Sequence, residues 1–557
     1  MKTKIYRFCQ DLSLWLFFSG MLNAAYALGP HEIVLLVNQN SLVSKEIANH
    51  YIQWRKIPSQ NVISLSLPES FFAGEVQVSP ENFRTMIFDP TLKAIKERHL
   101  DKYILAWIYS ADFPIRITSP QPMSLQGITF SKGQVVEAEQ IKTGSYRSRL
   151  FCGPDKANGP QVNGGTLDQY KNSLKEKMPI PSMMLSYVGT NGLTKKEALT
   201  TLRSGMIADH SFPTGTIFFI KSDDVRSTCR DWQFPGAAKE LKKLGVQAVI
   251  TTNFPVNQTS IMGVQMGNAY AFPRQAGIYL PGSMAEHLTS LGAVFHHPEQ
   301  TKLTAWLQAG ATASAGTVVE PYSVWPKFPH ARFYCHYARG YTLLESFYLS
   351  IRSPSQILLV GEPLAQPWAP PFSITFVSLD DHPKKKRTFY AQVSPSILSS
   401  RVNYRYYLDG KDVTQPLEQE TFHLDTEVLS DGYHELRAVA YTQGSIHYEA
   451  FSVQTFDVQN TGKRVELIGL APDSTIDFSN PIQLQVHVKG TQKPQFVGVM
   501  NHERLLGKKH VQDETSYTFE YNLDILGAGP NRLQAIAFYE DEEVRGKPLY
   551  FEIKQTE

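Results

Sequence analysis

The chain has 557 residues, of which 42% are apolar and 19% charged, so it can form about three or four globular domains. The formal net charge is +2, and the first 27 residues account for it through Lys2, Lys4 and Arg7 against Asp11. The rest is close to neutral and has no basic stripe interleaved with aromatic residues, which argues against a nucleic-acid partner.

The N-terminus has the organisation of a secretory signal peptide. Basic residues up to Arg7 precede an apolar run from Leu12 to Leu22, and small residues at Ala25 and Ala27 suit signal peptidase. The run is shorter than the roughly 20 residues that a transmembrane helix needs, and no later segment is long and apolar enough. We therefore expect cleavage after Ala27 and a secreted or periplasmic protein with no membrane span in the mature chain.

Residues 28–369 have the pattern of an α/β domain, in which a mostly parallel sheet is covered by helices, because short apolar runs alternate with helical periodicity. We expect strands at 33–37, 62–67, 103–109, 216–220, 247–252, 314–319 and 356–360. Helices are expected after a cap at Ser44 and at 195–208, 236–244, 283–291, 300–308 and 340–350. Residues 119–181 are rich in Gly, Pro and Asn and are interpreted as an irregular insertion.

The remaining residues predict two immunoglobulin-like β-sandwiches, at 370–460 and 461–557. Alternating strands are separated by turn signals such as Asp409-Gly410 and Asp431-Gly432. The run Leu436–Tyr441 is echoed by Leu533–Phe538, with Ala440 and Ala537 97 residues apart, which is the size of one such sandwich. Neither copy has the paired cysteines of antibody domains.

Polar residues repeatedly follow the predicted strands. In an open α/β sheet, ligands bind beyond the carboxyl ends of the strands, so these residues predict a polar or acidic ligand crevice. The alternative is that they cap the helices and turns that follow. The candidates are Asn38, Asp112, Arg116, Asp223, Asp224, Asn253 and Glu320.

No motif indicates a metal or a cofactor. The chain has no His-Glu-x-x-His or Cys-x-x-Cys spacing, no Walker loop and no Gly-x-Gly-x-x-Gly after a strand, so we expect neither. Without Cys9, three cysteines remain: Cys152, Cys229 and Cys335. A bridge between Cys152 and Cys229 with a free Cys335 is one interpretation, and three unlinked thiols is the other.

Several segments together resemble an uncharacterised family of exported bacterial proteins. They are "IVLLVNQNSLVSKEIANHYIQWRKIPSQNVISLSLP", "FPIRI", "GATASAGTVVEPY", "GYTLLESFYLS" and "VGEPLAQPW". The family's last motif typically has Gly-Asp-Pro-Leu followed by Pro-Phe, whereas here Glu362 replaces the aspartate and Trp368 the phenylalanine. The resemblance covers about residues 32–370 and implies no established activity.

The chain is also distantly similar to gingipain-type cysteine peptidases, which pair a caspase-like α/β sheet with an immunoglobulin-like domain. We therefore expect a caspase/gingipain-like or a flavodoxin-like α/β domain in this chain. Those peptidases use a His-Gly and a cysteine nucleophile after neighbouring strands. This chain lacks that pair, and Cys335 beside His336 is better interpreted as a core thiol. The leading hypothesis is a non-peptidase protein that binds an extracellular or envelope ligand, with sandwiches that act as spacers or adhesion modules. The alternatives are a hydrolase that uses the strand-edge carboxylates with Arg116, and a structural component of the cell envelope.

Overall fold

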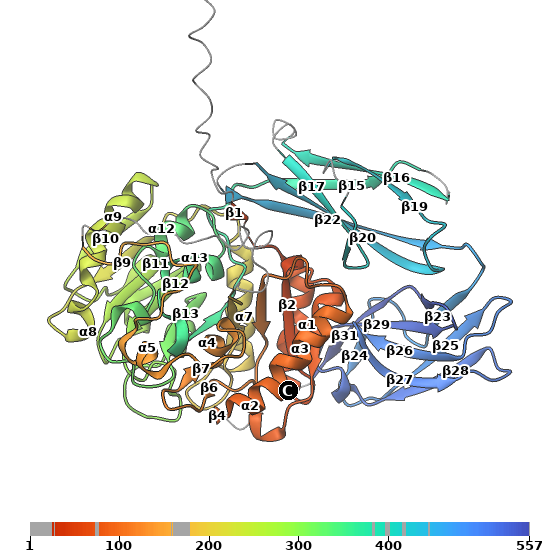
Figure 1. The fold of residues 1–557 in the computed structure, drawn as a ribbon, viewed down its shortest axis with the longest axis horizontal. Helices are drawn as coiled ribbons and strands as arrows, with labels where there is room; N and C mark the ends of the chain where they lie inside the picture. Colours follow the sequence, from red (N-terminus) through yellow and green to blue (C-terminus); the bar gives the residue numbers. More distant parts are fainter. Residues whose placement is uncertain are drawn as a thin grey trace, which may run out of the picture.

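The fold comprises an α/β domain and two β-sandwiches that lie against it (Figure 1). The computed structural model describes residues 25–26, 28–72, 77–157, 159, 179–380, 385–395, 402–414, 419–443 and 446–555. No helix in these described ranges is both long and apolar enough to cross a membrane.

A ten-stranded sheet forms the centre of the α/β domain. Eight of its nine neighbouring pairs are parallel, and the pair β13–β14 is antiparallel. In spatial order the strands are β10 (Gln247–Thr251), β9 (Thr216–Ile220), β11 (Gln258–Gly267), β12 (Gly277–Leu288), β13 (Ala313–Thr317), β14 (Ile357–Gly361), β8 (Ser182–Met184), β5 (Ala106–Tyr109), β2 (Ile33–Asn38) and β3 (Val62–Leu65).

The antiparallel pair divides this sheet into two halves that run in opposite directions. Ala313 pairs with Gly361 and Thr317 with Ile357, so the end of β13 lies beside the start of β14. The first half contains β14, β8, β5, β2 and β3, and the second half contains β13, β12, β11, β9 and β10. The carboxyl ends of the two halves therefore lie at opposite edges of the sheet.

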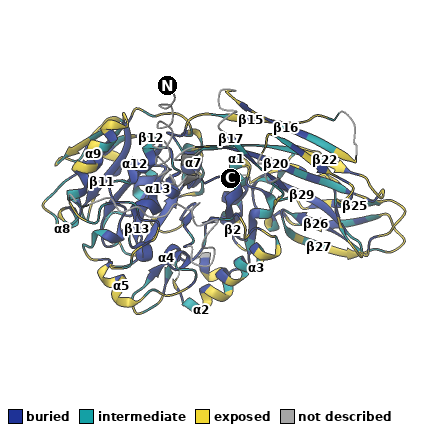
Figure 2. Ribbon diagram, turned by 45° about the horizontal axis from the view of Figure 1, so that its top comes forward, coloured by how far each residue is buried: buried dark blue, intermediate teal, exposed yellow. Residues whose placement is uncertain are grey.

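Helices cover the sheet, and most of its strands are buried among them, whereas the edge strand β10 is partly exposed (Figure 2). Ser41 begins the first long helix because its side chain accepts a hydrogen bond from the Ser44 amide. The helices are α1 (Leu42–Arg55), α2 (Pro80–Phe83), α3 (Asp89–Glu97), α4 (Leu125–Phe130), α5 (Ala138–Thr143), α7 (Lys195–Ile207), α8 (Val225–Thr228), α9 (Phe234–Lys243), α10 (Pro273–Ala276), α11 (Leu303–Gln308), α12 (Phe333–Ala338) and α13 (Leu343–Ser350), with a π-helical turn at Arg84–Phe88 between α2 and α3. A small sheet joins β4 (Gln77–Val78), β6 (Arg116–Ile117) and β7 (Met123–Ser124).

The α/β prediction is confirmed in its coarse form, with three corrections. The helix expected at 283–291 is wrong, because β12 occupies those residues up to Leu288. The strands β8 and β11 were not predicted, and the first helix is capped by Ser41 rather than Ser44. Within the region interpreted as an insertion, α4 is a buried helix, and Gln126 exchanges hydrogen bonds with the Leu359 backbone of β14.

The C-terminal residues form two sandwiches whose sheets are linked. The first contains β15 (Ser373–Ser378), β16 (Lys386–Ser394), β17 (Val402–Leu408), β18 (Lys411–Asp412), β19 (Thr421–Asp425), β20 (Gly432–Thr442), β21 (Ile446–His447) and β22 (Glu449–Val458). The second contains β23 (Arg464–Ile468), β24 (Thr475–Asp477), β25 (Ile482–Lys489), β26 (Phe496–Asn501), β27 (Arg504–His510), β28 (Ser516–Tyr521), β29 (Gly529–Phe538), β30 (Glu543–Arg545) and β31 (Leu549–Lys554). The two repeated runs lie in β20 and β29, and Gly432 pairs with Arg545 across the two modules.

Both sandwiches are hydrogen-bonded to the α/β domain. The Asn49 side chain on α1 donates to the carbonyls of Leu526 and Ala528 in the second sandwich, at 3.1 and 2.9 Å. Arg437 in the first sandwich donates to the Lys56 carbonyl at 2.8 Å. These contacts attach both sandwiches to the α/β domain.

Buried histidines give the fold a specific sensitivity to acid. Burial lowers the pKa of His287 to about 3, of His336 to about 4 and of His502 to about 3, so all three are neutral in the folded state at pH 7. In the unfolded chain they take up protons near pH 6.5. The unfolded state therefore binds more protons between pH 6.5 and about 4, and stability is lost as the pH falls through that window.

We expect the melting temperature to fall continuously between pH 7 and pH 4, as measured by scanning calorimetry. His287 accepts a hydrogen bond from the Trp306 indole N–H at 2.9 Å. His287→Phe should therefore lower the melting temperature at pH 7, and it should reduce the slope of melting temperature against pH. The exposed His510→Phe is the control and should keep the wild-type slope. Identical slopes for all three proteins would contradict this account.

Candidate functional site

Two of the predicted crevice residues meet at the carboxyl edge of the first half of the sheet. The Asn38 side chain donates to the Asp112 carbonyl at 2.9 Å, and the Ser41 hydroxyl donates to the Asp112 carboxylate. Burial raises the pKa of Asp112, although its hydrogen bond with Ser41 opposes that shift. These residues lie at the turn between β2 and α1, and their polar side-chain atoms are hydrogen-bonded mainly within this cluster.

The other five candidates lie at the opposite edge, because they follow strands of the second half or contact their ends. Asp224 caps α8 by accepting from the Arg226 amide at 2.9 Å, and Glu320 accepts from the Tyr322 amide at 2.8 Å. Arg116 donates to the Val318 carbonyl just after β13, at 3.1 Å. Asp223 and Asn253 follow β9 and β10. The hydrolase hypothesis requires Asp112, Asp223 or Asp224 to converge in one pocket with Arg116, and the strand directions place Asp112 and the pair Asp223 and Asp224 at opposite edges of the sheet.

Cys335 and His336 do not form a catalytic pair. The Cys335 thiol is buried and faces the Ala237 carbonyl at 3.6 Å, and burial raises its pKa to about 12. The His336 imidazole instead faces the Cys152 carbonyl at 3.2 Å. None of the three described cysteines is in a disulfide, so the interpretation with unlinked thiols is correct and the bridge between Cys152 and Cys229 is wrong.

A cleft of about 800 Å³ lies beside the carboxyl edge of β2, between the α/β domain and the second sandwich. Its walls offer amide, carboxylate and cationic groups together with exposed apolar surface, since Leu505 is 40% exposed. The α/β domain contributes Gln39, Asn40, Lys45 and Glu69, and the second sandwich contributes Arg504, Leu505, Leu506, Glu520, Tyr521, Asn522, Asp524 and Ile525. We call this space the β2 cleft.

The two cations of the β2 cleft are held by backbone and amide oxygens. Lys45 donates to the Asp524 carbonyl and Arg504 to the Ile525 carbonyl, while Arg504 also reaches the Gln39 side-chain oxygen at 3.5 Å. Burial and the nearby Arg504 lower the pKa of Lys45 to about 8, and Asp524 partly offsets this. Both cations thereby connect the α/β domain to the second sandwich and fix the walls of the cleft.

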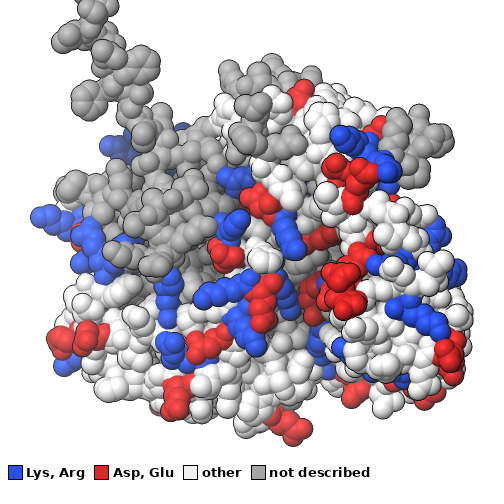
Figure 3. Space-filling model, turned by 45° about the vertical axis from the view of Figure 1, so that its right-hand side comes forward, with Lys and Arg blue, Asp and Glu red and all other residues white. Residues whose placement is uncertain are grey.

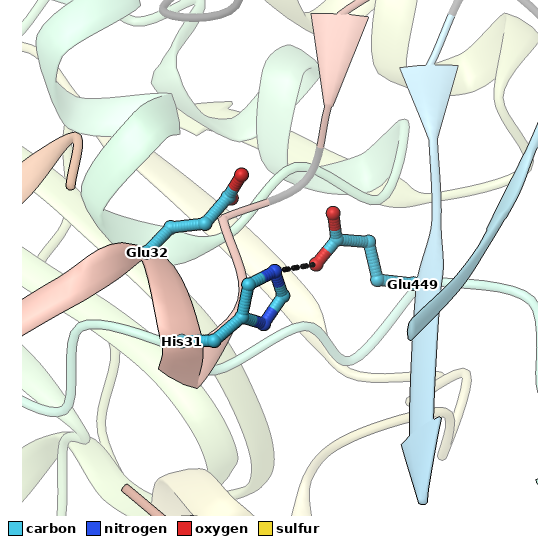
Figure 4. Close-up of side chains that lie close together, drawn as sticks. All are labelled: His31, Glu32 and Glu449. Carbon is cyan, nitrogen blue, oxygen red and sulfur yellow. Dashed lines mark ion pairs between the residues drawn. The ribbon is translucent and has the colours of Figure 1, made fainter. Parts of the chain in front are cut away.

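A second cluster lies where the first sandwich meets the start of the α/β domain. His31 and Glu32 come from a short helix, η1 (Pro30–Glu32), and Glu449 comes from β22. Figure 4 shows the His31 ring facing the Glu449 carboxylate, with 3.6 Å between Nε2 and Oε2. One ligand atom from each of the three residues lies within 4.8 Å of the others. An imidazole and two carboxylates at this spacing can hold a proton or a cation.

The charged surface is mixed in sign on the face shown in Figure 3, where acidic and basic side chains alternate. This agrees with the near-neutral balance outside the first 27 residues.

Most residues that shape these two sites leave no signal in the sequence. Lys45 and Arg504 are 459 residues apart, and no local pattern links them. His31 and Glu32 do carry a signal, because two ionisable residues directly precede a fully buried strand. That signal does not reveal Glu449, whose position depends on how the first sandwich docks.

Comparisons with known proteins match parts of the chain only loosely. No protein-family model and no curated protein matches the chain. Among solved structures, the D0-D1 domain of intimin is 14% identical, with 32% of this chain and 99% of that one covered at a TM-score of 0.18. Fibronectin(III)-like modules of Clostridium thermocellum CbhA are 16% identical, with 16% of this chain and 96% of that one covered at a TM-score of 0.15. A bacterial ice-binding adhesin is 12% identical, with 31% of this chain and 58% of that one covered at a TM-score of 0.14. At these TM-scores the matches do not bear on function, and the sandwich architecture rests on the strand pairings above.

Proposed function

We propose that the chain is an exported, non-peptidase binding protein, and that its ligand is a neutral, polyhydroxylated molecule such as an oligosaccharide held in the β2 cleft. The protein is released by cleavage after Ala27 and acts in the periplasm or outside the cell. The observation that carries the proposal is the cleft itself, which lies at a carboxyl strand edge, where α/β sheets bind ligands.

The lining of the β2 cleft favours this ligand class. Hydroxyl groups both donate and accept hydrogen bonds, and the amide side chains of Gln39, Asn40 and Asn522 line the cleft. The Asn40 amide nitrogen already donates to Ser66 and Leu67, so Asn40 offers a ligand its side-chain oxygen as an acceptor. Two cations face three carboxylates, Glu69, Glu520 and Asp524, so the lining is close to neutral and does not select a strongly charged ligand. The Tyr521 ring and Leu505 supply apolar surface for the C–H faces of a sugar.

Binding to an array of neutral oligosaccharides, followed by calorimetric titration with the strongest binder, tests this function. Asn40→Ala and Tyr521→Ala should each weaken binding about 10-fold, because each removes a hydrogen-bonding or apolar contact group from the wall. Lys385→Ala changes an exposed residue of a separate cleft on the first sandwich and should leave the affinity unchanged. Absence of any binder, or equal affinity in all variants, would reject the proposal.

An adhesion or structural role in the cell envelope is compatible with such a site, since an envelope glycan would be one such ligand. Co-purification with envelope fractions that depends on Asn40 and Tyr521 would assign that location. Peptide hydrolysis that Cys335→Ala abolishes would contradict the non-peptidase proposal.

A further inference from the structure

The first residues after the expected cleavage site enter a buried, acidic environment. Leu28 is 2% exposed, and its backbone N–H donates to the Glu345 carboxylate at 3.2 Å. The next N–H, from Gly29, donates to the Glu32 carboxylate at 3.3 Å. A Cβ at Gly29 would lie 2.4 Å from a Glu449 oxygen, so the Glu449 carboxylate lies directly against the backbone of Gly29. The start of the mature chain is therefore fitted against three carboxylates.

Those three carboxylates come from three different elements and are all buried. Glu32 in η1 is 0% exposed, Glu345 in α13 is 4% exposed, and the Glu449 side chain in β22 is 7% exposed. We call them the Leu28 carboxylates. Arg405 lies 4.0 Å from Glu32, measured from Nη1 to Oε1, and the His31 imidazole lies 3.6 Å from the Glu449 carboxylate. A positive charge placed directly beside a buried carboxylate stabilises its ionised form.

Helix capping explains only part of this arrangement. Glu345 forms a capping box with Thr342 at the start of α13, and Glu197 forms the same motif with Thr194 at the start of α7. Glu197 is partly exposed, whereas Glu345 is buried and burial raises its pKa to about 7, with Glu32 contributing. Capping accounts for the bonds to Thr342, but it accounts neither for this burial nor for the contact with Leu28.

We propose that the Leu28 carboxylates receive the α-ammonium group that cleavage after Ala27 creates on Leu28, so that the mature N-terminus forms a buried ion pair with Glu345. The inference rests on the export proposed above. Hydrolysis of the Ala27–Leu28 peptide bond consumes one water, leaves a carboxylate on Ala27 and leaves an ammonium group on Leu28. A neutral amide donor thereby becomes a cation, and its hydrogen bond becomes charge-assisted and stronger.

This ion pair couples processing to the assembly of the domains. Glu449 belongs to the first sandwich, and Glu32 and Glu345 belong to the α/β domain, so a cation at Leu28 holds both sides of the boundary. Cleavage also removes β1 (Ala25–Tyr26), which pairs with β21 of the first sandwich. The ion pair replaces that strand pairing as the link between the N-terminus and the sandwich.

Two mature chains that differ by one residue test the ion pair. One begins at Leu28, and the other retains Ala27, which displaces the α-ammonium group by one residue. The chain that begins at Leu28 should melt about 2 °C or more above the other. Glu345→Gln should abolish the difference between the two chains, whereas Glu197→Gln, which weakens a matched capping box, should preserve it. Equal melting temperatures, or a difference that survives Glu345→Gln, would overturn the proposal.

Mass spectrometry of the exported protein tests the processing step separately. A mature N-terminus at Leu28 supports the ion pair, and a mature N-terminus elsewhere overturns it. Neither outcome alters oligosaccharide binding at the β2 cleft, which is measured with Asn40→Ala and Tyr521→Ala, so the two proposals fail independently.

Discussion

Replacing Arg230 by methionine is expected to lower the free energy of unfolding of the α/β domain by about 3–5 kcal/mol. Arg230 is 0% exposed and donates to Glu286, which is 1% exposed, at 2.6 Å, as well as to the Met266 carbonyl. Gln265 donates to the same Glu286 oxygen at 3.0 Å. Without the guanidinium, a carboxylate remains in the core with one amide donor, and urea unfolding followed by tryptophan fluorescence measures the loss.

The pH dependence of this loss has a defined sign. Burial already raises the pKa of Glu286 even though Arg230 opposes the shift, and Arg230→Met removes that opposition. The folded variant then holds a proton that the unfolded chain releases near pH 4.5, so its destabilisation grows as the pH rises above that value. The double variant Arg230→Met with Glu286→Leu should recover most of the stability.

Arg226→Met is the matched control, because Arg226 pairs with Asp224 and both side chains are 26% exposed. Exposed pairs of this kind contribute about 0–1 kcal/mol. If Arg230→Met costs no more than Arg226→Met, the buried pair does not stabilise the fold as argued.

Replacing Arg55 by alanine is expected to have an effect of similar size, about 3–5 kcal/mol. Arg55 in the last turn of α1 contacts Glu362 through Nε at 2.9 Å and through Nη2 at 2.7 Å, and it also pairs with Asp209. Tyr51 donates to Glu362 at 3.0 Å. The substitution leaves the fully buried Glu362 beside a second carboxylate, and unfolding in urea should show the loss, with Lys493→Ala at an exposed pair as the control.

Glu362→Asp tests how closely the side chains of this cluster fit one another. The aspartate carboxylate is one methylene shorter and cannot keep both the Tyr51 and Arg55 bonds. We expect it to cost about 1–3 kcal/mol, the range for leaving a buried polar group without its partner. A Glu362→Asp protein as stable as wild type would show that α1 adjusts to the shorter side chain.

Sequence patterns predicted those elements whose burial follows the period of a strand or a helix. The strand at 33–37 was found because every residue of β2 is buried, and the helix at 195–208 because its buried residues recur at helical spacing. The segment 283–291 was mistaken for a helix because its first six residues form a continuous buried run, which strands and helices share, and because Pro281-Gly282 separates that run from the rest of β12. The reversal at β13–β14 leaves no local signal, since strand direction depends on chain connections rather than on side chains.

That reversal also limits how far the candidate site could be predicted. The rule that ligands gather at carboxyl strand edges correctly directs attention to the end of β2, where the β2 cleft opens. It cannot show that Asp223 and Asp112 lie at opposite edges, because it assumes one common strand direction. Nor can it find Arg504, which reaches the cleft only because the second sandwich folds back onto α1.

Amide hydrogen exchange, measured with and without the strongest binder from the neutral oligosaccharide array, tests ligand binding in the β2 cleft most directly. The account predicts slower exchange on both walls at once, in residues 39–45 of the α/β domain and 504–506 and 520–525 of the second sandwich. Protection confined to the first sandwich, or to the strand ends around Asp223 and Asn253, would contradict it.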